Sequence, residues 1–420
     1  MKETLFKFID DSAALAVELE TELTKIPAIS PESGGEGELD KCVFLESWLR
    51  AQGITQLERY DAPDKRAKGG VRPSLVATIP GTDTASKESG APRLWIMSHL
   101  DVVPPGEASL WKSDPWTVKQ TDGGDGRGIR LIGRGVEDNQ QGLTASVLAA
   151  LSLVKQGISP KHTVKLLFVA DEENGSIYGI DWLLKNVPDL FHKNDMILVP
   201  DGGDPKGETI EIAEKNLLWI RFSTIGVQAH GSRPDQGINA HLAGADLAVR
   251  LHEELTKKFP DHDPLFEPDY STFQPTKKEA NVPNINTIPG DDVFCMDMRV
   301  LPRYPVKTVL AEIDRIKAEV EAKRGVKISY TLPQSHESKA TAKDAPLVKL
   351  LSRTVKEVYQ VDTRPIGIGG GTVGAYLRNA GMDSVVWSRT DDTAHQPNEY
   401  TLLANILGDA KVMALLMLQG

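Results

Sequence analysis

Residues 94–104 read LWIMSHLDVVP, and this stretch indicates the fold of the chain around it. Four apolar residues and Ser98 lead into His99, Asp101 follows two positions later, and a pair of prolines begins at residue 104. A short, continuous apolar run is typical of a strand that is buried on both faces, as in a parallel sheet covered by helices. His99 and Asp101 would then lie at the carboxyl end of the strand, where open α/β sheets bind their ligands.

The same pattern recurs on both sides of this stretch. Apolar strands alternate with amphipathic helices up to about residue 214 and again after residue 333. One N-terminal helix is expected over roughly the first 25 residues. We therefore predict an α/β domain with a largely parallel sheet flanked by helices, built from residues 1–214 and 333–420.

Residues 215–332 are predicted to form a second domain that is inserted into the first. Its elements are expected in the order β-α-β-β-α-β, which is the order of a ferredoxin-like α+β unit. The second strand is expected near residues 284–288 and the third near residues 293–300. The connection from residue 256 to residue 280 is expected to lack regular structure.

Length, charge and cysteine content narrow the class of protein. A chain of 420 residues exceeds the size at which a single core keeps growing, so two domains are expected. The formal net charge of -11 argues against nucleic acid or an anionic membrane as a partner. Two cysteines are too few for a disulfide framework, and acidic residues interrupt the N-terminal segment where a signal peptide would be apolar. We expect a cytoplasmic protein.

Polar residues follow five of the predicted apolar strands. They are His99 with Asp101, Asp138, Glu172 with Glu173, Asp201, and His395. Two histidines and several carboxylates, with no thiolate, suit zinc, cobalt or manganese. A carboxylate such as Asp138 can bridge two metal ions roughly 3.5–4 Å apart. Asp101 is close enough in sequence to hydrogen-bond the second nitrogen of His99. Of Glu172 and Glu173, one can bind metal while the other stays free as a general base.

Each of these residues also has an ordinary structural interpretation when taken alone. His99 can be a satisfied strand-end histidine, and Asp138 can be the N-cap of the helix that follows it. Glu172 and Glu173 can begin a solvated helix, and the segments after Asp201 and around His395 can be plain turns. Their joint occurrence at five predicted strand ends nevertheless favours a metal site.

Eight motifs together resemble those of one enzyme family. They are SHLDVVP, GRGVEDNQQG, DEENG, PDGGD, AHGSRPDQGINA, NINTIPG, DMR and AHQPNE, in this order over roughly residues 95–400. The family includes acetylornithine deacetylase, succinyl-diaminopimelate desuccinylase, carboxypeptidase G and aminoacylase. The resemblance implies a zinc-peptidase-like catalytic domain with an inserted lid and dimerisation domain. It also implies hydrolysis of an amide bond in a small, carboxylate-bearing N-acyl amino acid or dipeptide.

The resemblance implies a role for each strand-end residue. Each chain would bind two divalent ions, either zinc or else cobalt or manganese. His99 and Asp201 would be ligands of one ion, Glu173 and His395 would be ligands of the other, and Asp138 would bridge them. Glu172 would be the general base, and Asp101 would orient His99.

Four residues elsewhere receive substrate-binding roles from the same resemblance. His230 would stabilise the oxyanion, and it would act in the partner's active site of a homodimer that forms through the lid domain. Asn286 and Arg299 would hold the substrate, Arg299 by a bidentate contact with a carboxylate. The backbone of the glycine-rich loop at Gly371 would approach that carboxylate.

Three observations leave alternatives to this interpretation. Many members of the family have Lys-Gly shortly after the bridging aspartate, whereas this chain has Asn139, Gln140, Gln141 and then Gly142. The glycines at positions 369, 371 and 374 match a dinucleotide-binding pattern, with Asp391 or Asp392 near the place of a ribose-binding acid. Too few residues follow that acid to complete a dinucleotide-binding fold. A non-catalytic binding or scaffold protein of the same family is the remaining alternative.

Overall fold

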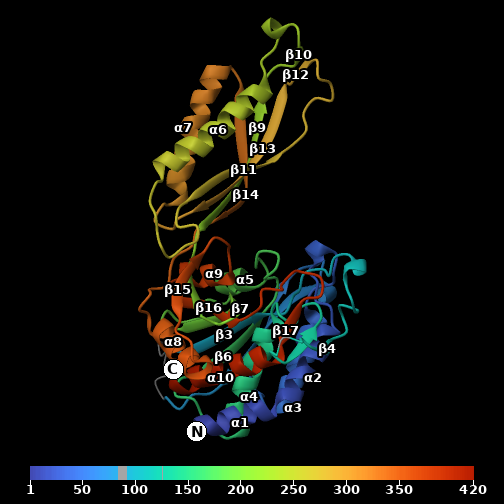
Figure 1. Ribbon diagram of the computed structural model, residues 1–420, viewed down its shortest axis with the longest axis vertical. Coiled ribbons are helices and arrows are strands. Elements are labelled where there is room, and N and C mark those ends of the chain that lie inside the picture. Colours follow the sequence, from blue (N-terminus) through green and yellow to red (C-terminus); the bar gives the residue numbers. More distant parts are fainter. Residues whose placement is uncertain (84–91, 125) are drawn as a thin grey trace. The chain divides into compact units, whose positions relative to one another are not determined.

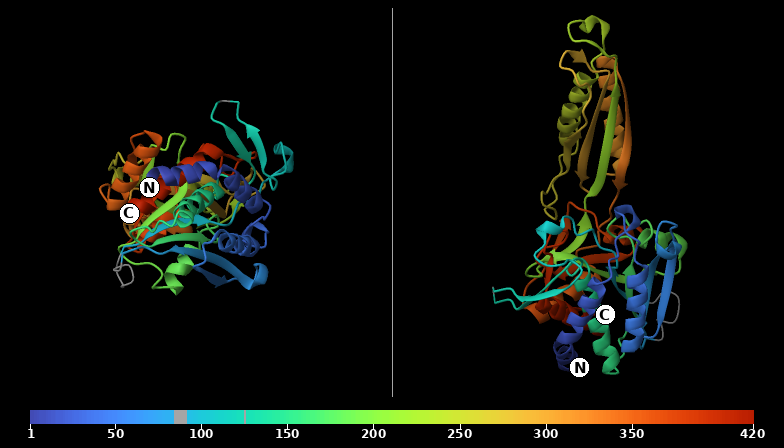
Figure 2. Two further views of the ribbon diagram at one scale, coloured as in Figure 1. Left: turned by 90° about the horizontal axis from the view of Figure 1, so that it is seen from below. Right: turned by 90° about the vertical axis from the view of Figure 1, so that its right-hand side faces the viewer.

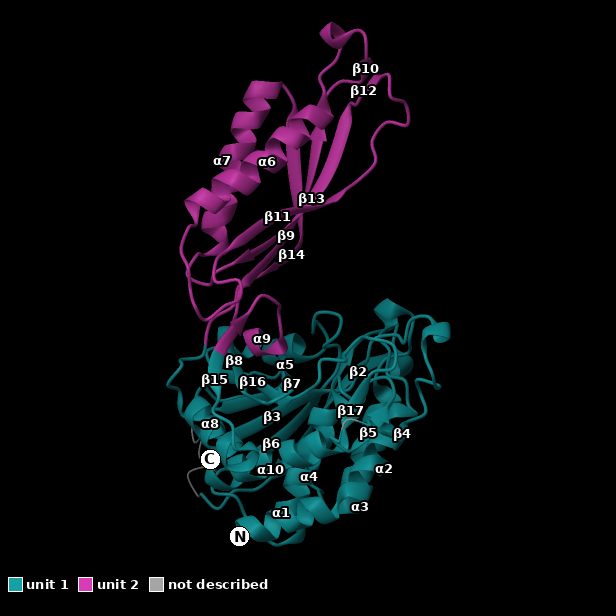
Figure 3. Cartoon of the chain, viewed as in Figure 1, with its two compact units in different colours: residues 1–212, 341–365, 376–420 teal, residues 213–340, 366–375 magenta. Residues whose placement is uncertain are grey.

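The computed structural model describes residues 1–83, 92–124 and 126–420 (Figure 1). These residues form two compact units, which are coloured separately in Figure 3. Unit 1 comprises residues 1–212, 341–365 and 376–420, and unit 2 comprises residues 213–340 and 366–375.

An eight-stranded sheet organises unit 1. Its strands lie in the order β1 (Leu57–Pro63), β2 (Val71–Ile79), β6 (Val164–Val169), β3 (Leu94–His99), β7 (Met196–Asp204), β16 (Asp383–Arg389), β8 (Thr209–Glu214) and β15 (Arg364–Ile368). The four central strands, β6, β3, β7 and β16, are parallel to one another. By contrast, β1, β2 and β6 pair antiparallel, and so do β16 and β8. The predicted α/β class is confirmed, but the sheet is mixed rather than largely parallel.

The parallel centre of the sheet is apolar because helices cover it. All six residues of β3 are buried, which explains the continuous apolar run at residues 94–97. Fully burying one such aliphatic side chain contributes about 1.5–3 kcal/mol to stability. Helix α4 (Gln140–Lys155) packs against β3, β6 and β7 and in turn contacts α10 (Leu403–Gln419). Residues 140–153 of α4 are all buried, as expected for a helix packed on several sides.

The remaining elements of unit 1 surround this core. The helices are α1 (Lys2–Asp11), α2 (Ala13–Thr24), α3 (Leu39–Gln52), α5 (Ile180–Asn186) and α8 (Pro346–Tyr359), and α9 (Val373–Asn379) begins in unit 2 and ends in unit 1. A three-stranded sheet has the order β17 (Tyr400–Leu402), β5 (Ile129–Ile132) and β4 (Lys119–Asp122). The prediction of a single N-terminal helix is wrong. The helix is interrupted at Ser12, which lies between α1 and α2 and whose hydroxyl donates to the carbonyl of Phe8.

Unit 2 contains a four-stranded antiparallel sheet with two helices on one face (Figure 2). The strand order is β11 (Thr272–Lys278), β13 (Asp291–Val300), β9 (Asn216–Ile225) and β14 (Lys327–His336). The helices are α6 (Ala240–Lys258) and α7 (Val306–Arg324). Buried and more exposed residues alternate along β13, and its buried side chains share one core with those of both helices. The chain order β9-α6-β11-β13-α7-β14 is the predicted ferredoxin-like order.

The second strand of this unit is not where the sequence predicted it. Residues 272–278 form β11 inside the connection that was expected to lack structure. Only Thr287–Ile288 of the expected strand is extended, as β12, and it pairs with β10 (Ala229–His230) outside the four-stranded sheet. The prediction failed because β11 is an edge strand with Pro275 and two exposed lysines, which resembles a loop in composition.

Unit 2 is larger than the predicted insertion at residues 215–332. It also includes residues 366–375, which carry the glycine-rich loop that the sequence analysis placed with residues 333–420. Backbone and side-chain contacts explain this assignment. The amide of Lys215 donates to the carbonyl of Ile368 at 2.9 Å, and the hydroxyl of Thr372 donates to Glu214 Oε1 at 2.6 Å. Among the described residues, no helix is long and apolar enough to span a membrane.

Candidate metal centre

The candidate ligands of unit 1 meet at one edge of its sheet. His99 ends β3, Glu172 and Glu173 follow β6, Asp201 lies in β7, and His395 follows β16. Asp138 precedes α4. His99 pairs with Val169 in the register of β3 and β6, so these parallel strands end side by side. The side chains of His99, Asp138 and Glu173 can place one ligand atom each within 4.8 Å of the others, and so can those of His99, Glu172 and Asp201.

Asp138 lies between the two histidines. Its Oδ1 is 2.9 Å from His99 Nε2, and its Oδ2 is 3.0 Å from His395 Nε2. Each histidine has a further carboxylate, since Asp201 Oδ1 is 3.5 Å from His99 Nε2 and Glu173 Oε2 is 3.0 Å from His395 Nε2. One carboxylate that faces two histidines, each with its own second acid, could bridge a pair of metal ions.

The residues present fit divalent metal ions. Glu173 Oε1 is buried and has no hydrogen-bond partner, so one oxygen is left available for a ligand. The Nδ1 of His99 lies 2.9 Å from the backbone carbonyl of Asp101 and can donate to it, which leaves Nε2 to face the carboxylates. A cavity of about 100 Å³ is bounded in part by Asp138 and Asp201. Imidazole nitrogen and carboxylate oxygen without thiolate suit zinc, cobalt or manganese.

The carboxylate of Asp101 does something that the sequence did not predict. It was expected to hydrogen-bond the ring of His99, but its Oδ1 lies 3.6 Å from Nδ1, whereas the Asp101 backbone carbonyl is nearer. The carboxylate instead accepts from the backbone amides of Glu172 and Glu173, both at 3.1 Å. Asp101 therefore contacts His99 through its main chain and holds the next loop through its side chain.

Buried acids hold two further ligand loops in the same way. Glu399 accepts from the backbone amides of Gly135, Glu137 and Asp138 at 2.9–3.1 Å. Glu137 accepts from the amides of Asp391 and Thr393, which precede His395. The loops that carry Asp138 and His395 thus hold each other in place.

Sequence reasoning missed these supporting residues. Asn139, whose side-chain amide donates to Asp201 Oδ1 and to the carbonyl of Pro200, both at 2.7 Å, was noted only as part of a departure from the family pattern. Glu399 ends the motif AHQPNE, but it was given no role. The motif spacing carries no signal for such contacts, because the partners of Asn139 and Glu399 lie far away in the sequence.

Comparison with known proteins identifies the family. Residues 95–419 match the family described as Peptidase family M20/M25/M40. The chain belongs to this family. The resemblance inferred from the motifs is confirmed, and with it metal-dependent hydrolysis of amide bonds. The glycine-rich residues 369–374 lie within the matched segment, so they need no dinucleotide to explain them.

Two curated relatives are similar to the chain in sequence, and two solved structures share its fold. An uncharacterized metallohydrolase of Methanococcus maripaludis is 37% identical over 94% of this chain and 97% of that protein. A succinyl-diaminopimelate desuccinylase of Cereibacter sphaeroides is 28% identical over 93% and 94% of the two chains. A tripeptidase from Staphylococcus aureus has a TM-score of 0.74 at 18% identity, covering 97% and 99%. A dinuclear metal-binding M20 peptidase from Bacillus subtilis has a TM-score of 0.67 at 14% identity, covering 98% and 99%.

The electrostatics of this M20 centre are dominated by its acids. Burial alone would lower the pKa of His99, but Asp201, Asp101 and Asp138 outweigh it and raise that pKa well above the usual range. Hydrogen bonds to Asp138 and Glu173 raise the pKa of His395 to about 10. In the absence of metal, the neighbouring acids therefore favour the cationic form of both imidazole rings.

The substrate-binding residues predicted for the M20 lid lie in unit 2. His230 is exposed, and its Nδ1 lies 2.8 Å from the hydroxyl of Ser232. The backbone carbonyl of Asn286 accepts from the amide of Gly231 at 2.6 Å, which places Asn286 beside the His230 turn. The participation of His230 and Asn286 in catalysis stays a prediction.

Arg299 and the glycine-rich loop are joined within unit 2. The Nε and Nη2 of Arg299 donate to the two oxygens of Asp297 at 2.7 and 2.9 Å, and Nη1 donates to the carbonyl of Gly369 at 2.6 Å. Arg299 is thus held beside the loop that contains Gly371. The role of both residues in substrate binding also stays a prediction.

Zinc binding should release protons and strengthen as the pH rises. A metal ion binds neutral imidazole, whereas the neighbouring acids raise the pKa of His99 above its usual range and that of His395 to about 10, which favours the protonated rings. Proton competition is therefore strongest at low pH and disappears above the pKa of the metal-free histidines. Calorimetric zinc titrations in buffers of different ionisation enthalpy measure the protons released. Zinc affinity that does not change with pH through the neutral range would contradict this assignment.

Proposed function

We propose that the chain binds two divalent metal ions, with zinc as the native metal, and hydrolyses the amide bond of a small N-acyl amino acid or dipeptide. The observation that carries this proposal is the placement of Asp138, with one oxygen facing His99 and the other facing His395. His99 and Asp201 would hold one ion, Glu173 and His395 the other, and Asp138 would bridge them. The solved M20 peptidase described as dinuclear supports this count.

Two metal ions at this site would polarise the substrate carbonyl and lower the pKa of an attacking water toward about 7. The chain's own contribution begins with Glu172, which lies within 4.8 Å of His99 and Asp201. Burial and the charge of Asp201 raise the pKa of Glu172 well above its usual range. A carboxyl group tuned in this direction can take a proton from water and pass it to the leaving amine.

The lid would supply the substrate contacts. His230 would stabilise the oxyanion that develops on the scissile carbonyl. Asn286, Arg299 and the backbone at Gly371 would hold the free carboxylate of the substrate. The guanidinium of Arg299 is already oriented by Asp297 and Gly369, which reduces the entropy lost when a second carboxylate binds. The desuccinylase and tripeptidase relatives support small acylated amines or peptides as the substrate class.

We further propose a cytoplasmic homodimer that forms through the lid domain. Cys42 and Cys295 are both free thiols, which suits a reducing compartment. Strand β11 lies at the edge of the four-stranded sheet of unit 2, and a two-fold contact along this edge would cover its unpaired backbone groups. Neither nucleic acid nor membrane is proposed as a partner, in keeping with the net charge of -11.

Substitution of the two adjacent glutamates should separate the general base from the ligand. Glu172→Gln should keep two zinc ions per chain but lower kcat by about 10²–10⁴-fold, because only the proton acceptor is lost. Glu173→Gln should bind less zinc, because an anionic ligand of the ion at His395 is replaced by a neutral amide. Metal analysis of reconstituted protein, together with steady-state kinetics, measures both effects. The reverse pattern would exchange the two roles, and a wild-type maximum of one ion per chain would contradict the dinuclear centre.

Amidation of the substrate's free carboxylate should lower kcat/KM by roughly 10- to 100-fold, because a charge-assisted contact with Arg299 is lost. In Arg299→Ala the acid and amide substrates should be hydrolysed at similar, low rates. Arg221→Ala is a matched control, since Arg221 also pairs with an acid in unit 2, Glu279, at 3.0 Å. This control should retain the preference for the acid. If Arg299→Ala retains it as well, Arg299 does not bind the carboxylate.

Mixing two inactive variants tests whether His230 acts in the partner's active site. Chains of His230→Ala and Glu172→Gln are dissociated, mixed and allowed to reassociate. Half of the dimers should be mixed, each with one complete active site, so activity should recover to about a quarter of the wild-type value per chain. Each variant treated alone is the control. Confirmed mixed dimers without activity would show that His230 serves its own chain or has no catalytic role.

A further inference from the structure

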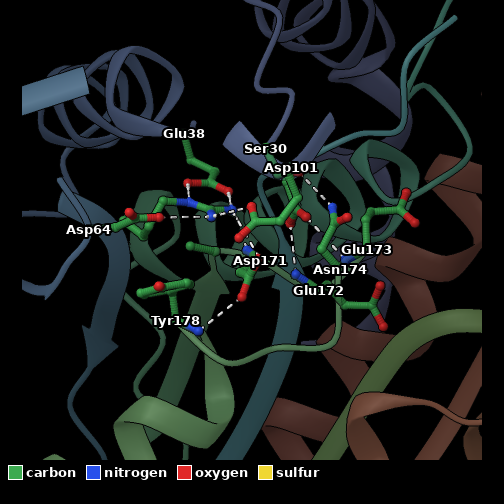
Figure 4. A network of polar contacts seen from close by, with 12 residues as sticks. Ser30, Glu38, Asp64, Asp101, Asp171, Glu172, Glu173, Asn174 and Tyr178 are labelled. Atoms are coloured by element: carbon green, nitrogen blue, oxygen red, sulfur yellow. Dashed lines mark hydrogen bonds and ion pairs between the residues drawn. The ribbon is translucent and has the colours of Figure 1, made fainter. Parts of the chain in front are cut away.

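The loop that carries Glu172 and Glu173 is held by three consecutive backbone amides (Figure 4). The amide of Asp171 donates to Glu38 Oε1 at 3.3 Å, and the amides of Glu172 and Glu173 donate to the two oxygens of Asp101 at 3.1 Å. These hydrogen bonds fix the backbone nitrogens of residues 172 and 173. Since each Cα atom is bonded to its nitrogen, the bonds also restrict the directions in which the two side chains leave the backbone.

Arg72 joins this loop to the rest of the unit. Its side chain is fully buried, and its Nε donates to Glu38 Oε2 at 2.6 Å while Nη2 donates to Glu38 Oε1. The same Nη2 donates to Asp171 Oδ1 at 3.2 Å. One guanidinium thus contacts both the acid that holds the loop and the first residue of the loop. A buried arginine is stable only when such charged partners surround it.

Asp171 closes the loop from within. Its backbone is left-handed, with φ of 62°, a conformation that a residue other than glycine keeps only where its surroundings hold it. The carbonyl of Asp171 accepts from the amide of Ser176 at 2.7 Å, and its Oδ2 accepts from the amide of Tyr178 at 2.9 Å. The contact with Arg72 fixes the other oxygen of the same carboxylate.

We propose that Arg72, acting through Glu38 and Asp171, is the positioning residue that orients the general base Glu172 and the metal ligand Glu173. This inference rests on the roles proposed above for those two glutamates. Arg72 and Glu38 both precede residue 95, where the match to the M20 family begins, so they lie outside the segment that contains every ligand.

A second ion pair, between the partly buried Arg93 and the buried Asp195, offers a control. Arg93 immediately precedes β3, and its Nη2 lies 2.6 Å from Asp195 Oδ2. It lies at the amino end of the strand that ends in His99, so it is remote from the ligands along β3. Arg93→Met should lower the melting temperature without changing kcat or zinc affinity, because it removes an ion pair that touches no ligand loop.

The experiment compares Arg72→Met, Asp171→Asn and Arg93→Met as full-length chains. Asparagine tolerates a left-handed backbone, and its one oxygen can still accept from the amide of Tyr178. Its NH2 group then faces Arg72, so Asp171→Asn removes both the charge and the acceptor that meet Arg72. We measure kcat and KM of the zinc-loaded enzyme, zinc affinity by competition with a chelator, and the melting temperature of the metal-free protein. Arg72→Met and Asp171→Asn should each lower kcat about 10- to 100-fold, change KM little, and weaken zinc binding.

The measurement of zinc affinity also distinguishes a positioning role of Arg72 from a purely electrostatic one. Removing a cation near an acidic centre would by Coulomb's law strengthen zinc binding, whereas a displaced Glu173 weakens it. Tighter zinc binding in Arg72→Met, or unchanged kcat and zinc affinity with a lower melting temperature, would overturn the proposal. If Arg72→Met does not fold, the kcat of Asp171→Asn decides, because the loss of an anion weakens zinc binding by charge alone. Zinc affinity needs no turnover, so it still tests the proposal if the wild-type protein hydrolyses no amide and the proposed function fails.

Discussion

Repulsion among buried carboxylates is the constraint on which the rest of unit 1 depends. Asp138, Glu172, Glu173 and Asp201 all lie around His99, and burial opposes a negative charge on each of them. Hydrogen bonds to the backbone help to hold these acids together, because buried carboxylates accept from the backbone amides of neighbouring loops that carry candidate ligands. Each loop is therefore fixed by groups that belong to another loop, and the acids stay together before any cation arrives.

The candidate ligands could be selected from the sequence, and expected to lie together, because they obey a local rule. Each follows or lies near the end of an apolar strand, and parallel strands such as β3 and β6 bring their carboxyl ends to one edge. The supporting contacts follow no such rule. Arg72 and Asp171 are 99 positions apart, and Glu399 meets amides more than 260 positions away. Only the folded chain shows which acid meets which amide.

The two units differ in how well the amino-acid composition of a segment predicts whether it forms a strand. Strands in the centre of the large sheet are buried on both faces, so their apolar character identifies them. Strand β11 has only Phe273 buried, and its proline and lysines give it the composition of a loop. The antiparallel pairing of β1 with β2 was hidden for a related reason, because apolar runs mark burial but not strand direction. The order of elements along the chain was therefore predicted better than strand direction or the position of the edge strand.

The interlocking of the loops limits how the metal centre can be moved or redesigned. A scaffold that received only the two histidines and the candidate carboxylate ligands would lack Glu38, Glu137 and Glu399, whose carboxylates accept from backbone amides of those loops. It would also lack Arg72, which pairs with Glu38. Grafting would have to transfer whole loops together with the acids that bind their amides. For the same reason, exchanging one ligand loop between related enzymes should succeed only when its amide-binding partner in the other loop is exchanged with it.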